Sequence, residues 1–525
     1  MEYNSENEIS LLDKGKHGLL HMVFSRLGLI VLLLVLQIGI ILHFYIAFRD
    51  YSPYYYSVSL ILSFIIFVQI INNSNIEPTS KITWLALIAA MPLFGAFMFL
   101  YTKQDIGFRA LKFQASRILK STEKAIPQDS ETMEKLQAES PETASLAQYI
   151  ARTGCHPVYE NTDVRYFPLG EDKFRRMLEE LEKAEKFIFM EYYIVDEGHM
   201  WGRILDVLSR KAKEGVTILF MYDGNNEFLT LPRGYDKKLQ QLGIQCKVFA
   251  PATPFVSTHY NYRDHRKILV IDNKVAFTGG INLADEYING YAKYGHWKDT
   301  AIMLKGEAVK SFTLMFLQMW NVTGSKEDYS AYLNIKTDTS EHADGFIIPY
   351  GDSPLDDERV GETVYLEIIN TAKDYVHIFT PYLILDSETV TALQNAAKRG
   401  VDVRICIPHI PDHKIAFAIA KTHYYDLIPH GVRIYEYTPG FIHAKMMVSD
   451  GIKAVVGTIN LDYRSLYLHF ECAVLIYGAS VIADIENDAH ETFEKSKEIT
   501  KADLKRHGLL FALYTGLLKL IAPLM

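Results

Sequence analysis

The sequence predicts an α/β protein built from two similar lobes, which are related by a pseudo-twofold axis and preceded by N-terminal transmembrane helices. Three observations support this prediction: long apolar runs concentrated in the first 101 of 525 residues, alternating strand-like and helix-like segments in the body, and an internal repeat. The net charge of −9 argues against a general nucleic-acid binder, because such proteins usually carry a basic excess. The four scattered cysteines, without a C-x-x-C pair, favour a reduced, cytosol-facing body.

Three apolar runs mark the N-terminal region: Leu27 to Phe48, Tyr54 to Ile71 and Ile82 to Tyr101. Because about 20 apolar residues cross a bilayer, we expect two or three spans and a multi-pass protein of the cell membrane. The basic residues between Lys103 and Lys124 place that segment and the body in the cytosol by the positive-inside rule. Three spans would put the N-terminus outside, yet the tail carries Lys14, Lys16 and Arg26, so the number of spans stays open.

The chain divides into six predicted parts. They are a tail at 1–26, a transmembrane region at 27–101, a basic juxtamembrane segment and polar linker at 102–145, a first lobe at 146–338, a second lobe at 339–500, and a C-terminal amphipathic helix at 501–525.

The two lobes are predicted from a repeat that is strongest around two histidines. Residues 265–287 and 443–465 align without gaps, and nine of the 23 positions are identical. Earlier in each half, a strand-like segment beginning near Phe187 matches one beginning near Tyr375. A duplicated fold of this kind implies a pseudo-twofold axis, and a residue near the axis meets its own counterpart.

The aligned segments carry the residues expected to perform chemistry. The first copy contains His265, Lys267, Asp272 and Asn282, and the second contains His443, Lys445, Asp450 and Asn460. In each copy the histidine and lysine are two residues apart, so on a strand they point to one face.

These residue types suit the displacement of a group from a phosphodiester. The two lysines supply fixed positive charge, and the two asparagines supply neutral donors to the non-bridging oxygens. A neutral imidazole attacks phosphorus, while the opposite, protonated imidazole donates a proton to the leaving alcohol. The repetition of the pattern in register makes decoration of a surface strand a poor explanation.

Each histidine also needs an acid that orients it. We expect Asp299 for His265 and Glu471 for His443, because the separations within each half are similar, at 34 and 28 residues. Asp272 and Asp450 have two readings, as members of the catalytic motif or as side chains that tie the turn after the strand. No metal site is expected, because lysine is not a metal ligand and no further cluster of histidine and acidic residues is apparent.

At these residues the sequence resembles the phospholipase D superfamily, whose H-x-K-x4-D motif occurs twice per site, over roughly residues 155 to 495. It is similar in particular to bacterial cardiolipin synthases, through segments such as Trp297 to Thr300 and Gly440 to Lys445. This resemblance implies a reaction of two phosphatidylglycerols to cardiolipin and glycerol, without cofactor or metal. It implies a phosphatidyl-histidine on His265, with His443 as acid and base, although the pseudo-symmetry allows the reverse.

The expected partners are phosphatidylglycerol and anionic membrane lipids, and not nucleic acid. The basic segment after the apolar runs can attract anionic headgroups. Near the C-terminus one helical face carries Leu510, Leu513, Leu517, Leu520 and Ile521, which fits an interfacial helix or one that docks on the core. A hydrolase, a transferase with another alcohol, a nucleic-acid phosphodiesterase and a non-catalytic scaffold are the alternatives.

Overall fold

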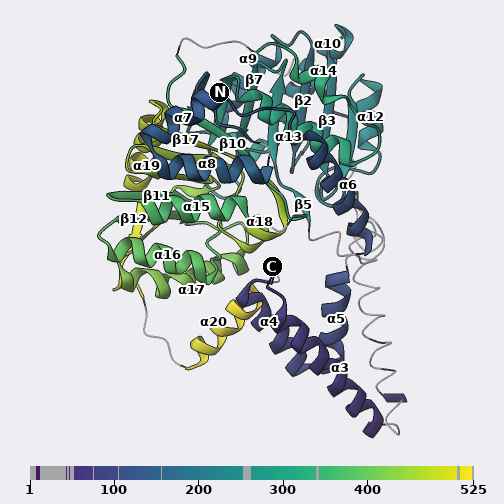
Figure 1. Ribbon diagram of the computed structural model, residues 1–525, viewed down its shortest axis with the longest axis vertical. Coiled ribbons are helices and arrows are strands. Elements are labelled where there is room, and N and C mark those ends of the chain that lie inside the picture. Colours follow the sequence, from purple (N-terminus) through teal and green to yellow (C-terminus); the bar gives the residue numbers. More distant parts are fainter. Residues whose placement is uncertain are drawn as a thin grey trace.

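The computed structural model describes residues 8–11, 39, 43, 46–47, 52–74, 76–104, 106–154, 156–251, 262–337, 342–356, 358–504 and 509–522. Its body consists of two α/β lobes that lie against each other, as the repeat predicts (Figure 1).

The first lobe is built on a seven-stranded mixed sheet in the order β1-β9-β7-β6-β2-β3-β4. The strands are β1 Thr162–Phe167, β2 Phe187–Tyr192, β3 Thr217–Asp223, β4 Gln245–Phe249, β6 Lys267–Ile271, β7 Val275–Gly279 and β9 Ala301–Gly306. Strands β2, β3 and β4 pair in parallel, and the remaining neighbours pair antiparallel.

The second sheet repeats this order as β10-β17-β16-β15-β11-β12-β13 and adds β18 at its edge. The strands are β10 Phe346–Asp352, β11 Tyr375–Phe379, β12 Asp402–Pro408, β13 Arg433–Tyr437, β15 Met446–Ser449, β16 Lys453–Gly457, β17 His469–Tyr477 and β18 Ser496–Ile499. Again the three strands β11, β12 and β13 are parallel. The topology therefore duplicates strand by strand, which confirms the two-lobed α/β prediction.

Helices cover both sheets. They are α6 Ile106–Thr122, α7 Ser130–Glu139, α8 Pro141–Gly154, α9 Gly170–Leu181, α10 His199–Lys213, α11 Asn226–Leu229, α12 Tyr235–Gln241, η4 Asp285–Ile288, α13 Val309–Val322, α14 Tyr329–Leu333, α15 Val360–Thr371, α16 Ser387–Lys398, α17 Lys414–Leu427, η5 Ile428–His430, α18 Tyr463–Tyr467 and α19 Val481–Glu494. Helix α13 is buried almost throughout, and its Phe312 and Phe316 share one apolar core with Ala454 and Val456 of the second sheet. The two lobes are therefore joined by a common core.

The polar segment expected to be a linker is ordered as α7 and α8. Leu136, Ala144 and Ile150 are buried in the core of the second sheet, although they precede the first lobe in sequence. The residues from 146 to 154, predicted to begin the first lobe, therefore pack on the second lobe. The spacing of the apolar residues in α8 explains this, because it gives the helix one buried face.

One short strand from each lobe pairs with a strand of the other lobe. Strand β5 (Arg263–Asp264) pairs in parallel with β17, and β14 (Gly440–Ile442) pairs in parallel with β8 (His296–Lys298). Each of the strands β5 and β14 directly precedes a motif histidine. The backbone before each histidine is therefore hydrogen-bonded to a strand of the opposite lobe: β17 of the second sheet for His265, and β8, which forms a separate two-stranded sheet with β14, for His443.

The N-terminal and C-terminal helices lie together below the body (Figure 1). They are α3 Ser52–Asn72, α4 Pro78–Ala90, α5 Pro92–Gln104 and α20 Leu509–Ile521. The second apolar run lies in α3, whereas the third is divided between α4 and α5, because Pro92 cannot continue the helix that ends at Ala90. Most of the first run lies outside the described residues.

Within the parts of the chain that the structure describes, no helix combines the length and apolar character that a membrane crossing requires. Helix α20 divides its apolar residues between two environments. Leu518 and Ala522 are buried against the second lobe, while Leu513 and Leu517 are 56% and 62% exposed. The helix therefore docks on the core along one edge and presents a second apolar edge to the surroundings.

The aspartates of the two motifs occupy equivalent turns. Asp272 and Asp450 both adopt a positive φ of 54°, where an aspartate is tolerated, in the tight turns after β6 and β15. The Asp272 carboxylate accepts three backbone N–H bonds, each 2.7 Å long, from Glu185, Lys186 and Phe187. Asp450 accepts three equivalent bonds of 2.9 Å from the residues that lead into β11. Both carboxylates therefore bind the backbone at the beginning of a central strand, β2 or β11, and not the histidines.

We predict that Asp272→Ala lowers the free energy of unfolding by about 1–3 kcal/mol, because the buried N–H of Phe187 and the half-buried N–H groups of Glu185 and Lys186 lose their acceptor. Thermal unfolding and the turnover number of the folded fraction should be measured together. Asp272→Asn is the matched control and should lose less, because it keeps one acceptor oxygen and tolerates the same φ. An alanine variant with unchanged stability and abolished turnover would instead make Asp272 a catalytic residue.

Candidate active site

The two motif histidines lie at the interface between the lobes, each held by the opposite one. The backbone N–H of His265 donates to the carbonyl of Phe470 at 2.9 Å, and that of His443 donates to the carbonyl of Lys298 at 2.7 Å. Both imidazoles are buried, with 6% of each residue exposed. The parallel pairing of β5 with β17 and of β14 with β8 thus fixes the backbone on which both histidines stand.

The orienting acids pair across the interface. Nδ1 of His265 lies 2.8 Å from Glu471 Oε1, and Nδ1 of His443 lies 2.7 Å from Asp299 Oδ2. The pairing within each half that we predict from the separations is therefore wrong. The crossing strands give the reason: Asp264 pairs with Phe470 and Ile442 pairs with Lys298, so the next residue along each chain is a histidine on one side and an acid of the opposite lobe on the other.

One equivalent position in the two repeats, Gly280 and Thr458, differs according to the acid that lies beside it. A Cβ at Gly280 would come within 2.0 Å of an Asp299 carboxylate oxygen, so only glycine leaves room for that acid. The equivalent residue, Thr458, instead donates its hydroxyl to Glu471. With each carboxylate on Nδ1, the proton of a neutral imidazole is held there and Nε2 is left for substrate.

Both motif lysines are buried beside these pairs. Lys267 donates to the carbonyl of His265, and Lys445 donates to the carbonyl of His443. Burial lowers the pKa of Lys267 to about 8 and that of Lys445 to about 7, although the carboxylates of Glu471 and Asp299 oppose the shifts. An incoming phosphodiester would stabilise the charged ammonium groups.

Burial also keeps the imidazoles neutral in the unliganded protein. It lowers the pKa of His265 well below 6.5, helped by the positive charge of Lys267 and by His469. The pKa of His443 falls to about 4 through burial and the charge of Lys445, while Asp299 opposes the shift. Lys445 and His443 also act electrostatically on His265, and Lys267 acts on His443, so the two half-sites form one electrostatic unit.

The two motif asparagines have different surroundings. Asn282 accepts from the backbone of Ile194 at 3.0 Å and donates to the Tyr287 hydroxyl at 2.8 Å. Asn460 is buried, and its Oδ1 has no hydrogen-bond partner among the described residues. The phosphate contact that we expect from both asparagines stays a prediction, and for Asn282 it would use the second amide proton.

Sequence reasoning missed the rings that flank the histidines. His265 has Tyr193 at 4.8 Å and His469 at 5.4 Å between ring centroids, and His443 has Tyr287 at 5.4 Å and Trp297 at 5.5 Å. His469 and Trp297 are equivalent, since each stands two residues before an orienting acid. That shared position was a signal that could have identified them.

Potential metal ligands also meet in the site. His265, His469 and Glu471 bring one ligand atom each within 4.8 Å of one another. Lys267 lies in the same electrostatic environment, and its ammonium group disfavours a cation there. We therefore interpret these three side chains as hydrogen-bonding partners and not as metal ligands. The expectation that no metal takes part stays a prediction.

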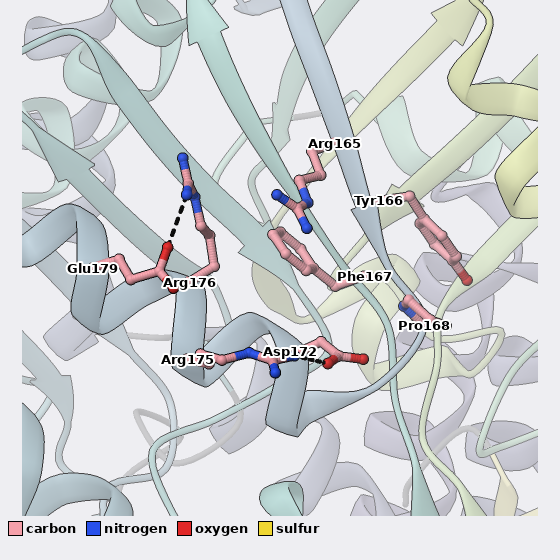
Figure 2. A pocket seen from close by; sticks show the side chains of 8 residues that line it. All are labelled: Arg165, Tyr166, Phe167, Pro168, Asp172, Arg175, Arg176 and Glu179. Atoms are coloured by element: carbon pink, nitrogen blue, oxygen red, sulfur yellow. Dashed lines mark hydrogen bonds and ion pairs between the residues drawn. The ribbon is translucent and has the colours of Figure 1, made fainter.

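A pocket elsewhere on the first lobe contains none of the motif residues. It is lined by Arg165, Tyr166, Phe167, Pro168, Asp172, Arg175, Arg176 and Glu179, from β1 and α9 (Figure 2). Arg175 pairs with Asp172, and Arg176 pairs with Glu179. Four of the five charged side chains in the lining therefore form ion pairs with one another, and the lining residues that the structure describes include no histidine, so the pocket lacks the signature of a catalytic centre.

The family model described as "Cardiolipin synthase, PLD-like domain" matches residues 177–320 and 365–493. The chain belongs to this family. It is 33% identical over 475 residues to the cardiolipin synthase of Alkalihalophilus pseudofirmus, covering 89% of this chain and 93% of that protein. It is also 33% identical over 477 residues to the cardiolipin synthase of Geobacillus kaustophilus, covering 90% and 94%. Membership of this family makes the protein a phosphatidyltransferase.

A solved structure shares the fold at much lower identity. The phosphatidylserine synthase of Haemophilus influenzae Rd KW20 superimposes with a TM-score of 0.53 and 14% identity, covering 69% of this chain and 95% of that one. This likeness supports the two-lobed architecture alone.

We predict that Glu471→Gln and Asp299→Asn each lower turnover by about 10²–10⁴-fold, because the amide no longer stabilises the correct imidazole tautomer. The crossed pairing is tested by ¹⁵N spectra of histidine-labelled protein. Glu471→Gln should shift the ring signals of His265, and Asp299→Asn those of His443. His265→Ala and His443→Ala variants assign the two signals, and the opposite pattern of shifts would refute the crossed arrangement.

Proposed function

We propose that the protein synthesises cardiolipin by transferring a phosphatidyl group from one phosphatidylglycerol to another, with release of glycerol. The observation that carries this proposal is the pair of crossed histidine–carboxylate contacts flanked by two buried lysines. The names of the relatives support the choice of lipid substrate.

In the proposed first step, Nε2 of His265 attacks the phosphorus of one phosphatidylglycerol. A P–N bond forms, the bond from phosphorus to the glycerol headgroup breaks, and His443 gives its proton to the departing glycerol oxygen. Lys267 and Lys445 offset the negative charge that develops on the non-bridging oxygens. Glu471 holds His265 in the tautomer that attacks and stabilises the cationic ring that forms.

In the second step, His443 takes the proton from the glycerol hydroxyl of a second phosphatidylglycerol. The hydroxyl oxygen attacks phosphorus, the P–N bond breaks, and His265 returns to its neutral form as cardiolipin leaves. His443 gives one proton to the departing glycerol and gains another from the second phosphatidylglycerol, so the cycle consumes no net acid or base.

Attachment to an anionic membrane belongs to the same proposal. Exposed apolar side chains gather on the helices below the body, among them Leu60, Ile61 and Phe64 of α3 and Leu513 and Leu517 of α20. On α6, Lys112, Arg117 and Lys120 are exposed. Apolar surface of this extent suits a lipid interface, and the basic residues suit anionic headgroups.

The acceptor alcohol distinguishes the main proposal from its alternatives. Purified protein in detergent micelles should be incubated with labelled phosphatidylglycerol, and lipids and glycerol quantified. We expect cardiolipin and glycerol in equal amounts. Phosphatidic acid as the sole lipid product would indicate a hydrolase, and turnover only with an added alcohol would indicate a different transferase.

Each motif histidine is predicted to be indispensable. His265→Ala and His443→Ala should each retain less than about 1% of turnover, because loss of a nucleophile or of its acid costs about 10²-fold or more. Product formation and thermal unfolding should be measured on the same samples. His413→Ala removes an exposed histidine and serves as the control. Substantial activity in a folded motif variant would exclude the two-histidine mechanism.

The pH dependence of kcat/KM follows from the lowered pKa values. The pKa of His443 near 4 and those of Lys445 and Lys267 near 7 and 8 mean that these groups lose needed protons as the pH rises. We therefore expect kcat/KM to fall between pH 6 and 9, and more steeply above pH 8. His265 stays neutral throughout, because its pKa lies well below 6.5.

The kcat profile should be flatter over the same range, because a bound phosphodiester raises the pKa of all three groups. Initial rates at low and at saturating phosphatidylglycerol separate the two profiles. A kcat/KM that rises with pH across this range would contradict the assigned protonation states.

A further inference from the structure

A second group of potential ligands lies outside the catalytic site, between β11 and α19. It consists of His377 on the strand and of Glu486 and His490 on the helix. Nδ1 of His377 lies 2.8 Å from Glu486 Oε1, and Nε2 of His490 lies 3.0 Å from the same oxygen. The three ligand atoms all lie within 4.8 Å of one another.

The duplicated fold shows that this histidine is not required for packing. The register of the sheets makes His377, opposite Val448, equivalent to Phe189, opposite Val270. Phe189 packs on Phe316 of α13 at 4.7 Å between ring centroids, with no polar group involved. The second lobe thus places an imidazole where the same fold is satisfied by a phenyl ring.

The imidazole is also only partly satisfied by hydrogen bonds. His377 is 2% exposed, and its Nε2 has no hydrogen-bond partner among the described residues. Burying a polar atom without a partner costs about 1–3 kcal/mol. Glu486 Oε2 is likewise buried without a hydrogen-bond partner among the described residues, so the His–Glu–His chain leaves one carboxylate oxygen of the cluster able to accept a further ligand.

We propose that His377, Glu486 and His490 form a zinc site that ties β11 to α19. Two imidazoles and one carboxylate are a donor set that Zn²⁺ accepts, with water in the fourth position. Glu486 and His490 are four residues apart on α19, so both face the strand. The His490 side chain is 54% exposed, which leaves an entry path and lets its ring shift to tetrahedral geometry.

The surroundings favour an ordered site. The Tyr375 ring stacks on His377 at 4.7 Å, and Phe493 meets it edge-on at 5.1 Å, which holds the imidazole in place. Arg404 is the cross-strand neighbour of His377, but its charge is paired with Asp402 at 2.9 Å. Because Asp402 offsets the charge of Arg404, Arg404 repels a cation bound at His377 less strongly.

The test uses the full-length, untagged protein in detergent after treatment with a chelator. Equilibrium dialysis against Zn²⁺ should give one bound ion per chain, and Co²⁺ in its place should give the absorption of a tetrahedral nitrogen–oxygen site. Zinc at a hundredfold excess over Kd should raise Tm by about 5 °C.

His490→Ala removes an exposed ligand and should weaken zinc binding by at least about 100-fold, since even outer-shell changes cost 10–100-fold. Its Tm without metal should match the wild type. Glu486→Gln should also abolish the zinc-dependent rise in Tm, and His413→Ala should leave it intact.

His469→Asn separates this site from the catalytic cluster of His265, His469 and Glu471, and it should bind zinc like the wild type. The proposal is overturned if the wild type binds no zinc, or if His490→Ala binds it equally well. It is also overturned if only His469→Asn loses binding, because the ion would then belong to the catalytic site.

Discussion

The exchange of carboxylates between the lobes is the constraint on which the rest of the site depends. Asp299 and Glu471 are fully buried, and a buried carboxylate persists only when it is hydrogen-bonded or paired. Each carboxylate has its imidazole partner on the opposite lobe. Strands β5 and β14, which directly precede the two histidines, pair with strands of the lobe that carries the acid and so bring the partners together. Separating the lobes would leave both carboxylates and both histidines without their partners, so neither lobe holds a complete catalytic unit.

The duplication is imperfect where it affects chemistry. Behind the first motif stand the buried ionisable side chains of Glu191, Asp264 and Arg266, with Arg266 and Glu191 3.8 Å apart. Their counterparts in the second lobe are apolar: Phe379, Ile442 and Ala444. Lysine charges lower the pKa of both imidazoles, but Asp299 raises the pKa of His443, while the charged groups that act on His265 only lower its pKa. This difference favours His265 as the nucleophile and His443 as the group that carries the proton.

The features that could be predicted from sequence are those with a local or repeated signal. The repeat around His265 and His443 was sufficient to predict the two lobes, because identical spacing in two copies of a segment indicates that the same fold occurs twice. The partner of each acid was not predictable, since β5 and β14 are two and three residues long and carry no pattern that reveals a crossing. Likewise, hydropathy alone described one continuous third run, whereas the backbone restriction at Pro92 divides it. His469 was overlooked although it stands two residues before Glu471, as Trp297 stands before Asp299, because the ring contacts that give this position its role cross between the two halves of the chain.

In the proposed reaction, selection of a lipid acceptor over water would follow from the same burial that lowers the pKa values. In the unliganded site burial lowers the pKa of both imidazoles and of both lysines, and the negative charge of a bound phosphodiester would raise these pKa values, so that the groups take up from solvent the protons that catalysis needs. Aromatic rings surround both histidines and limit the room for water around a phosphatidyl-histidine. Helix α20 docks through Leu518 on a cluster with Tyr463, three residues after Asn460, which places an apolar helix close to the motif. An acceptor that arrives with acyl chains gains contacts along this path, and water gains none, so the same apolar surface that would bind a membrane would also favour transfer over hydrolysis.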